Sequence, residues 1–323
     1  MSFEPIARDR AARRVPWPSP GMAAAVTLAV VLAGVTLSAW WLYHCEQRVL
    51  EEIDALPGIS VDAEYKFVGP RFLEAYAERE WMKWLGRVRS LTVYDESGQH
   101  AALPYVYPSA RPLLKQLPRL QSLRQCQSLA VLGLTVDGNR CFQGLVMCEQ
   151  LRTVQIIECD LSQDALRGLD GHGGVTSIEL ENCSVDGVVL ELPKVETLLS
   201  VRAKLTQFEQ IDVSNTPNLR RVEAKHCGFT DEGVKMLLNA PRLEVLMASN
   251  GTLTDAAIDD LLQLRSLRYL DLRHNGWLTR PAFERLAALP RLQIVNVYHT
   301  SADAELDELQ KRLPQARSDR NQL

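Results

Sequence analysis

The sequence lacks the short motifs by which common enzyme classes are recognised. It has no C-x-x-C pair, no G-x-S-x-G, no H-E-x-x-H and no set of kinase motifs. A strong charge imbalance is also missing, since 36 basic and 40 acidic residues leave a formal net charge of −4 over 323 residues. Non-specific nucleic-acid binding requires a concentrated basic face. We therefore expect no enzyme of these classes, no cofactor and no nucleic-acid partner.

Charged residues are absent from Val15 to Tyr43. Within this stretch, Met22 to Tyr43 is mostly apolar and would be about 33 Å long as a helix, enough to cross a bilayer core of about 30 Å. Trp17 lies before it, and Trp40 and Trp41 lie near its end, as in an aromatic belt. The sequence therefore predicts a transmembrane helix over residues 21–43.

The charges that flank this span predict its orientation. Residues 1–20 form a basic tail that includes Arg8, Arg10, Arg13 and Arg14, and the residues after the span are mainly acidic. The positive-inside rule places the tail in the cytoplasm and the rest of the chain outside it. The alternative is a cleaved signal peptide, but its apolar region would be only about 7–15 residues long. The length favours an uncleaved signal-anchor in a single-pass membrane protein.

A motif with the spacing L-x-x-L-x-L-x-x-N/C-x-L recurs along the rest of the chain. One copy runs from Leu219 to Phe229 with Cys227 at its ninth position, and another from Leu267 to Trp277. The spacing and the regular interval between copies are those of leucine-rich repeats. The copies begin at Leu129, Leu151, Val175, Val195, Leu219, Leu243, Leu267 and Leu292.

These repeats predict an α/β solenoid. The apolar positions of each frame alternate along a short strand, and parallel strands would form the concave side. Thr230 and Thr254 each precede acidic residues in a position suited to cap a helix, so short helices are expected outside the sheet. A single repeat cannot bury its own apolar face, so stability must come from stacking. The predicted fold is a leucine-rich repeat solenoid preceded by one transmembrane helix.

The two ends of the repeat array, residues 88–301 and regular from 129, require caps. Residues 44–87 are expected to form the first cap, with a helix from Cys45 to Leu56, a strand from Val61 to Phe67 and an aromatic helix from Phe72 to Leu85. Val88 is interpreted as the start of a degenerate ninth frame. A capping helix is predicted over residues 302–314, and a solvated tail over 315–323.

The chain resembles the membrane-anchored leucine-rich repeat proteins abundant in planctomycete-type bacteria. The resemblance rests on the segment from Ile53 to Val61, the Trp-Leu-Gly before Val88, and the ending Leu309-Gln-Lys-Arg-Leu-Pro314. The repeats are similar to the cysteine-containing subtype, as in Cys227 to Gly233. The resemblance implies this architecture and no particular activity.

Three of the seven cysteines, Cys159, Cys183 and Cys227, share the ninth position of their frames. We expect them to be buried free thiols where the strand turns outward, since free cysteine is among the most buried residue types. Cys45 differs because it follows the predicted span. We interpret it as an incidental juxtamembrane cysteine, with lipidation or an intermolecular disulfide as the alternative.

Three histidines, His226, His274 and His299, share the eighth position. Two of them would lie on adjacent strands, which raises a metal-dependent enzyme as a remote alternative. However, His226 would be two strands from His274, and no helix-spaced pair exists. We therefore predict no metal site and interpret these histidines as exposed residues at the rim.

The concave face is the remaining candidate site, because the third, fifth and seventh positions point there. In the early and middle frames these positions would bring Val131, Thr135, Thr153, Ile157, Leu199 and Val201 to that face. The later frames combine both charge signs with two tyrosines, a composition that suits a protein or peptide partner. The predicted partner-binding residues are Arg221, Glu223, Lys225, Tyr269, Asp271, Arg273, Asn296 and Tyr298.

Two functions remain open. The first is non-catalytic recognition of a protein or peptide by an extracytoplasmic repeat surface. The second is a structural envelope organiser that self-associates through Cys45 and the span. For the concave residues themselves, the alternative to partner binding is a solvated strand face with cross-strand ion pairs.

Overall fold

The structure is a computed structural model that describes residues 19–77, 79, 83, 85–96, 111–117, 123–138 and 140–319. The chain divides into two compact units, Met1–Leu42 and Tyr43–Leu323. Helix α1, Pro20–Asp54, begins in the first unit and ends in the second.

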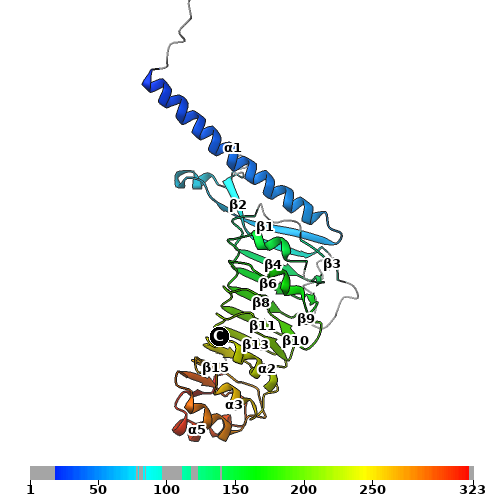
Figure 1. The fold of residues 1–323 in the computed structure, drawn as a ribbon, viewed down its shortest axis with the longest axis vertical. Coiled ribbons are helices and arrows are strands. Elements are labelled where there is room, and N and C mark those ends of the chain that lie inside the picture. Colours follow the sequence, from blue (N-terminus) through cyan, green and yellow to red (C-terminus); the bar gives the residue numbers. More distant parts are fainter. Residues whose placement is uncertain are drawn as a thin grey trace, which may run out of the picture. The chain divides into compact units, whose positions relative to one another are not determined.

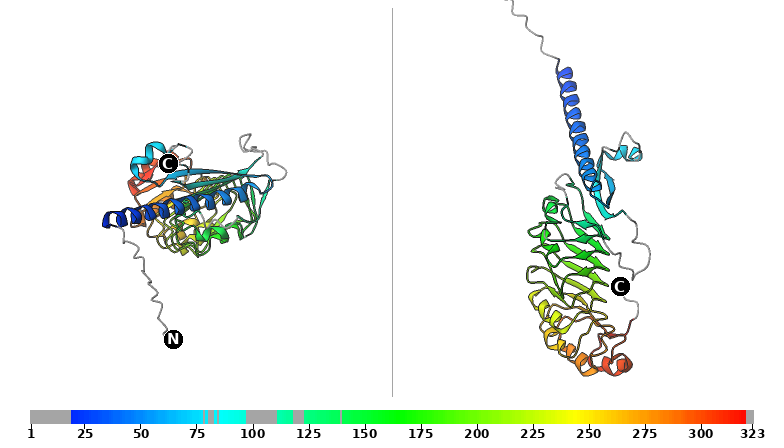
Figure 2. Two further views of the ribbon diagram at one scale, coloured as in Figure 1. Left: turned by 90° about the horizontal axis from the view of Figure 1, so that it is seen from above. Right: turned by 90° about the vertical axis from the view of Figure 1, so that its right-hand side faces the viewer.

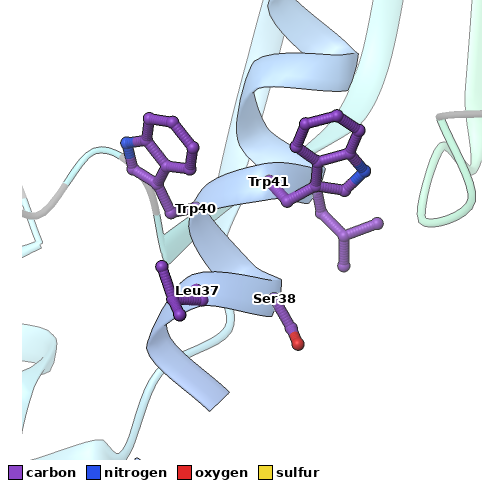
Figure 3. Close-up of a pocket in the computed structure, with 5 residues that line it drawn as sticks. Leu37, Ser38, Trp40 and Trp41 are labelled. Atoms are coloured by element: carbon purple, nitrogen blue, oxygen red, sulfur yellow. The ribbon is translucent and has the colours of Figure 1, made fainter. Parts of the chain in front are cut away.

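The part of α1 in the first unit is apolar and exposed. Figure 3 shows Trp40 and Trp41 projecting from this helix beside a shallow depression, whose lining comes from α1 alone. Within the described part of the chain, α1 is the one helix long and apolar enough to cross a membrane, by its length and composition.

The second unit is built on an 11-stranded sheet (Figure 1). β1 and β2 pair in antiparallel fashion, and every later pair in this sheet is parallel. In spatial order the strands are β1 Ile59–Phe67, β2 Gly86–Asp95, β4 Ser128–Leu132, β6 Thr153–Ile157, β8 Ser177–Glu181, β11 Ser200–Lys204, β13 Arg221–Lys225, β14 Val245–Met247, β15 Tyr269–Asp271, β16 Ile294–Asn296 and β17 Ala316–Arg317.

The opposite side of the core changes character along the solenoid. In the first half it is made of short strands and 3-10 turns: β3 Leu113–Leu114, β5 Thr135–Val136, η5 Gln143–Met147, β7 Asp160–Leu161, η6 Ala165–Leu169, β9 Ser184–Val185, β10 Val189–Glu191 and β12 Gln210–Asp212. In the second half it is helical: α2 Asp231–Met236, η7 Leu237–Asn239, α3 Ala257–Leu261, α4 Arg280–Arg285, η8 Leu286–Ala288, η9 Asp303–Glu305 and α5 Leu306–Arg312. This arrangement confirms the predicted α/β leucine-rich repeat solenoid.

Two of the predicted frames are wrong by three residues. Leu129 pairs with Val154, the fourth position of the next frame, so the first position of its own repeat is Cys126. Val201 likewise pairs with Val222, so that repeat begins at Leu198 and not at Val195. With these corrections the repeats begin at Val88, Cys126, Leu151, Val175, Leu198, Leu219, Leu243, Leu267 and Leu292.

The corrected register removes an apparent irregularity. A frame that began at Val195 would place Ser200 and Ala203 at core positions, and this repeat would then differ from all the others. In the Leu198 frame, Val201 and Ala203 are the fourth and sixth positions, and both are buried. The Val88 frame also stacks as a true strand, because Leu91 pairs in parallel with Leu129.

Trp277 does not occupy a core position. Leu278 is fully buried in its place, and Trp277 is 73% exposed. The repeat that begins at Leu267 has 25 residues before the next frame, one more than its two predecessors. The additional residue lies after Asn275 and displaces Trp277 to the surface.

The eighth position has the same backbone conformation in eight consecutive repeats. Its φ lies between 53° and 68° at Gly133, Glu158, Asn182, Leu205, His226, Asn250, His274 and His299. This left-handed region is one in which Asn and His are enriched among non-glycine residues. The backbone requirement therefore accounts for histidine at this position in three repeats.

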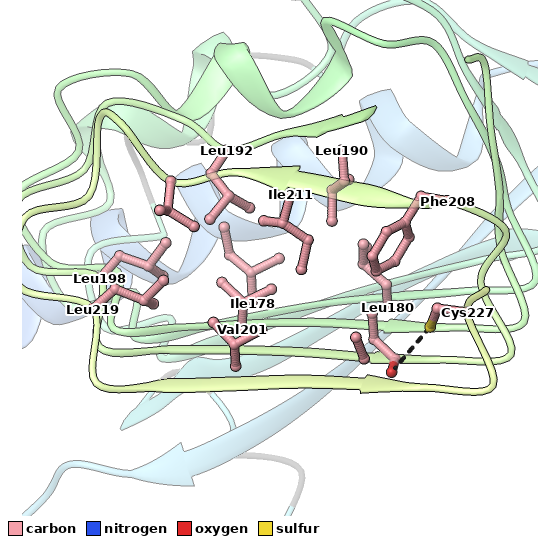
Figure 4. Close-up of a cluster of buried hydrophobic side chains, with 14 of the residues drawn as sticks. Ile178, Leu180, Leu190, Leu192, Leu198, Val201, Phe208, Ile211, Leu219 and Cys227 are labelled. Atoms are coloured by element: carbon pink, nitrogen blue, oxygen red, sulfur yellow. Dashed lines mark hydrogen bonds between the residues drawn. The ribbon is translucent and has the colours of Figure 1, made fainter. Parts of the chain in front are cut away.

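The ninth position directs a donor inward from the turn. Cys183 Sγ donates to the Ile156 carbonyl oxygen of the preceding repeat at 3.2 Å and to the Glu181 carbonyl of its own repeat at 3.4 Å. Cys159 and Cys227 make the equivalent pairs of bonds. Figure 4 shows one of the two bonds of Cys227. Asn275 does the same with its amide, donating to Ala248 O at 2.8 Å. These bonds tie each turn to the previous repeat.

The seven cysteines are all free, and six of them are buried. Burial raises the pKa of the Cys227 thiol to about 12 and that of the Cys183 thiol to about 11. The thiols are therefore protonated at neutral pH, as hydrogen-bond donation requires. The prediction of buried free thiols at the ninth position is confirmed.

The start of the solenoid is covered by α1 and β1. Val49, Leu50 and Ile53 of α1 are buried in the core cluster, and so is Ile59 of β1. The segment predicted as an aromatic capping helix has instead a 3-10 turn, η1 Arg71–Tyr76, and positions 78, 80–82 and 84 lie outside the described residues.

The far end is closed by α5 and by a strand that the sequence did not predict. Leu309 and Leu313 are fully buried, as their spacing suggested. The residues expected to form a solvated tail include β17, which pairs with β16, and Ala316 is fully buried. Residues 320–323 lie outside the described part.

The corrected register can be tested with two neighbouring leucines. Leu198 is fully buried and Leu199 is 40% exposed. We expect Leu198→Ala to lower the free energy of unfolding by about 2–5 kcal/mol and Leu199→Ala to change it by about 0.5 kcal/mol or less. Urea unfolding of the full chain in detergent measures both, and equal losses would contradict the register.

The burial of the thiols predicts their reactivity. A maleimide reagent at neutral pH should label Cys45, which is half-buried, far faster than the six buried cysteines. Mass spectrometry should then find one rapidly labelled cysteine in the native full chain and seven in the chain unfolded in urea. Rapid labelling of Cys159, Cys183 or Cys227 in the native chain would contradict their burial and their hydrogen bonds in the turns.

Candidate functional site: the concave face of the main sheet

The concave face is the surface of the main sheet that points away from the core. Three rows of side chains cross it, from the third, fifth and seventh positions of successive repeats. The register aligns Arg202 with Glu223, Glu223 with Met247, and Met247 with Asp271 in the fifth-position row. The predicted set from Arg221 to Tyr298 belongs to these rows.

The residues predicted for the early part of this face require correction. Val131 and Val201 are fully buried in the core, because each of their frames was displaced by three residues. Thr135 belongs to β5 on the opposite side. Thr153 and Ile157 do lie at the third and seventh positions and are half-buried.

The first half of the concave face carries no charge at these positions. Its third-position row consists of the hydroxyl residues Ser90, Ser128 and Thr153, and the row continues as Ser177 and Ser200 into β8 and β11. Tyr94, Leu132 and Ile157 form an apolar seventh-position row over the same strands β2, β4 and β6. The charged part of the face begins at β8.

Glu223 is the centre of the charged part. Its side chain is 9% exposed and contacts three cations: Arg221 Nε at 2.6 Å, Arg202 Nε at 3.2 Å and Lys225 Nζ at 3.2 Å. Burial alone would raise the pKa of Glu223, but the hydrogen bond from Arg221 and the charges of Arg221 and Lys225 hold it below its usual value. The carboxylate therefore stays ionised and fixes the cations around it.

The ion pairs continue across the neighbouring strands. Arg202 also contacts Glu179 at 2.9 Å, and Gln155 Nε2 donates to the other oxygen of Glu179 at 2.9 Å. Lys204 and Glu181 form a second pair at 2.7 Å in the seventh-position row. Arg202 and Lys204 have side chains about half exposed, and the incorrect Val195 frame hid their place on this face.

Asp271 and Arg273 form a separate pair on the last repeats. Asp271 is fully buried, and Arg273 binds it through Nη2 at 2.7 Å and Nε at 2.9 Å. The buried Asn296 donates from Nδ2 to the carbonyl oxygen of Asp319 at 2.9 Å, so the segment after β17 bonds to this end of the face. These polar groups are satisfied within the chain.

The aromatic residues of the predicted set have different surroundings. Tyr269 is half-buried, and its hydroxyl is buried without a hydrogen-bond partner in the part of the chain described. Tyr298 packs edge-on against His274, with ring centroids 5.5 Å apart. His274 also stacks on His299 at 4.9 Å. No group of three His, Cys, Asp or Glu side chains among the described residues could hold a metal ion.

The predicted set thus separates into two classes. Glu223, Asp271 and Asn296 are buried and serve to position their neighbours. Arg221, Lys225, Tyr269, Tyr298 and, to a smaller extent, Arg273 present part of their side chains to solvent. The cross-strand ion pairs anticipated as an alternative are present, and the solvent-facing cations remain the groups that a partner could contact.

No protein-family model and no curated protein matches the chain. Among solved structures it is similar to a complex of TLR13 with ssRNA13, at 15% identity over 64% of this chain, with a TM-score of 0.44. An internalin (InlF) of Listeria monocytogenes is 15% identical over 65% of this chain, with a TM-score of 0.31. A leucine-rich repeat protein of Leptospira interrogans is 16% identical over 64% of this chain, with a TM-score of 0.38.

The chain covers 33% of the TLR13 chain, 86% of the internalin and 69% of the Leptospira protein. It therefore spans about a third of the first of these structures. Such distant likenesses say nothing about a shared partner or activity. The repeat fold follows from the strand register of the chain itself.

Removing the charge of Glu223 tests its central role. We expect Glu223→Gln to lower the free energy of unfolding at pH 7 by about 1–3 kcal/mol, because three cations lose a buried partner. The control Glu181→Gln breaks an exposed pair and should cost about 1 kcal/mol or less.

The pH dependence of this difference has a definite sign. Because the pKa of Glu223 is lowered in the folded chain, its contribution is complete above the ordinary glutamate pKa and is lost as the pH falls through the lowered value. The difference between wild type and Glu223→Gln should therefore shrink in acid. A difference that stays constant down to about pH 2 would contradict the assignment.

Proposed function

We propose that the chain is a non-catalytic, single-pass membrane protein that presents its repeat solenoid outside the cytoplasm to a protein or peptide partner. The observation that carries this proposal is the fixed group of cations around Glu223. Arg202, Arg221 and Lys225 are held by ion pairs before any partner arrives, so binding would cost little additional side-chain entropy.

The topology rests on the apolar part of α1 and on the charges that flank it. The basic residues precede the span and the acidic residues follow it, which favours a cytoplasmic N-terminus. The resemblance of the sequence to membrane-anchored bacterial repeat proteins agrees with this arrangement. An extracytoplasmic solenoid would meet its partner at or near the membrane surface.

The partner surface is proposed to include the solvent-facing members of the predicted set, above all Arg221, Lys225 and Tyr298, together with Arg202 and Lys204. Arg202, Arg221 and Lys225 each turn part of the side chain to solvent, so a partner carboxylate would be attracted to their positive charges. Complementary charge of this kind gives orientation and selectivity more than raw affinity.

The test is a quantitative pull-down from the native envelope with the full chain as bait. We expect the double variant Arg221→Gln/Lys225→Gln to reduce recovery of the specific partner at least about tenfold, which corresponds to 1.4 kcal/mol. Arg273 is left unchanged because its loss would leave Asp271 buried without its cation.

The matched control is Lys235→Gln/Arg285→Gln. It removes two exposed cations that also pair with acidic residues, but on α2 and α4 behind the core. Lys235→Gln/Arg285→Gln should unfold at nearly the wild-type temperature. Arg221→Gln/Lys225→Gln should unfold at a lower temperature, because Glu223 then keeps only Arg202 of its three cations, so recovery is measured at a temperature where all three chains are folded. Equal recovery with the two double variants would exclude this part of the concave face as the binding surface.

A further inference from the structure

The β1–β2 hairpin exposes apolar and aromatic side chains at its distal end. Tyr65 is 45% exposed, Val68 58% and Tyr76 48%. All three lie within twelve residues of sequence: Tyr65 is on β1, Val68 follows its last residue, and Tyr76 ends η1. Figure 2 shows η1 at the tip of the hairpin, away from the repeats. Soluble surfaces rarely gather large apolar side chains without a partner.

The hairpin returns toward the start of the second unit. Ile53 of α1 and Ile59 of β1 belong to the same buried cluster. Farther along both elements, Gln47 Nε2 donates to the hydroxyl of Tyr65 at 2.8 Å. As β1 proceeds from Ile59 to Phe67, it therefore runs back along α1 in the direction of Tyr43.

Simple lengths place the tip at the level of Tyr43. From Gln47 to Tyr43 the helix rises about 6 Å, at 1.5 Å per residue. From Tyr65 to Val68 an extended chain advances about 10 Å. Val68 thus reaches at least as far along the α1 axis as Tyr43, the predicted end of the membrane span. The headgroup layer is itself about 5–8 Å thick on each side.

We infer that the tip of the β1–β2 hairpin rests on the outer surface of the membrane, with Val68, Tyr76 and Tyr65 in the interfacial layer. This inference rests on the proposed membrane anchor. It adds a second contact with the bilayer, which would restrain the rotation of the solenoid about its anchor. Tyrosine suits this layer because its ring is apolar and its hydroxyl remains hydrated.

The charge of the hairpin specifies what kind of membrane surface it fits. From Lys66 to Leu85 the sequence has four basic and three acidic residues. Attraction to anionic lipid would therefore be small, because such attraction grows with each uncompensated basic residue. The hairpin tip therefore binds the lipid interface without requiring anionic lipid, and a zwitterionic phosphatidylcholine membrane should be enough for this contact.

Depth-dependent quenching tests the inference in the full chain. The chain is reconstituted into phosphatidylcholine vesicles that contain brominated acyl chains, and one fluorophore is attached to a single introduced cysteine in a Cys45→Ser background. The positions are Val68→Cys at the hairpin tip, Trp41→Cys in the span as the anchor control, and Trp277→Cys in a distant repeat as the exposed control.

We expect brominated lipid to reduce emission at positions 68 and 41 and to leave position 277 unchanged. Adding Tyr76→Glu should lower the quenching at position 68 severalfold, because a charge in the interface opposes insertion, and leave position 41 unaffected. Quenching at 41 with none at 68 would overturn the hairpin contact while leaving the anchor in place. Absence of quenching at both 41 and 68 would overturn the anchor itself and the inference with it.

Discussion

The turn that follows each strand is the constraint on which the solenoid depends. At the eighth position the backbone adopts a left-handed conformation, and at the ninth position of most repeats a thiol, hydroxyl or amide points inward. In Cys183 and Asn275 this side chain binds a carbonyl of the preceding repeat and one of its own. No repeat can bury its apolar face alone, so each one depends on its contact with the neighbouring repeat. These bonds cross that contact and therefore help to fix how the repeats stack.

The same turn explains two features that otherwise suggest chemistry. The position-nine cysteines are buried, protonated donors, which is a structural role. The position-eight histidines occupy a backbone conformation that His tolerates better than most residues do. In the repeat that begins at Leu243 the ninth residue is Gly251, and the backbone approaches closely there: a Cβ would lie 2.6 Å from the carbonyl oxygen of Phe229 and 3.1 Å from Oδ1 of Asn275.

Once the register is fixed, it decides the chemistry of the concave face. It aligns Glu179, Arg202 and Glu223 on adjacent strands, so opposite charges meet at the 4.7–4.9 Å spacing of a sheet. On strands β2, β4 and β6, nearest the N-terminal cap, the same register produces a row of hydroxyl side chains and a row of apolar side chains. The face thus changes along the solenoid from uncharged, to ion-paired, to a last part where Asn296 bonds to the returning chain.

Much of this could be predicted from sequence, and the errors have physical causes. The segments around Leu129 and Val195 have apolar residues three apart, as in Val195, Leu198 and Val201, so the repeat motif fits in two registers. Hydrogen-bond pairing with the neighbouring strands selects one of them. Trp277 was misplaced because one additional residue in the turn is invisible to a motif with a fixed length.

The sequence predicted where the candidate site lies better than it predicted which of its side chains are exposed to a partner. Alternation along strands placed Arg221, Glu223 and Lys225 on the concave face. It could not indicate that Glu223 is enclosed by three cations, or that Asp271 is fully buried beneath Arg273, because these depend on side chains from neighbouring repeats and strands. Arg202 and Lys204 were missed because the frame was started at Val195, three residues before the true first position at Leu198.

The sequence by itself determined the repeat architecture and the apolar N-terminal segment, because periodic spacing and an uncharged run are local properties. The tertiary structure alone decided the register of two repeats, the pairing of the concave charges, the additional strand β17 and the return of the β1–β2 hairpin along α1. Each of these arises from contacts between residues far apart in the chain, for which no local pattern exists.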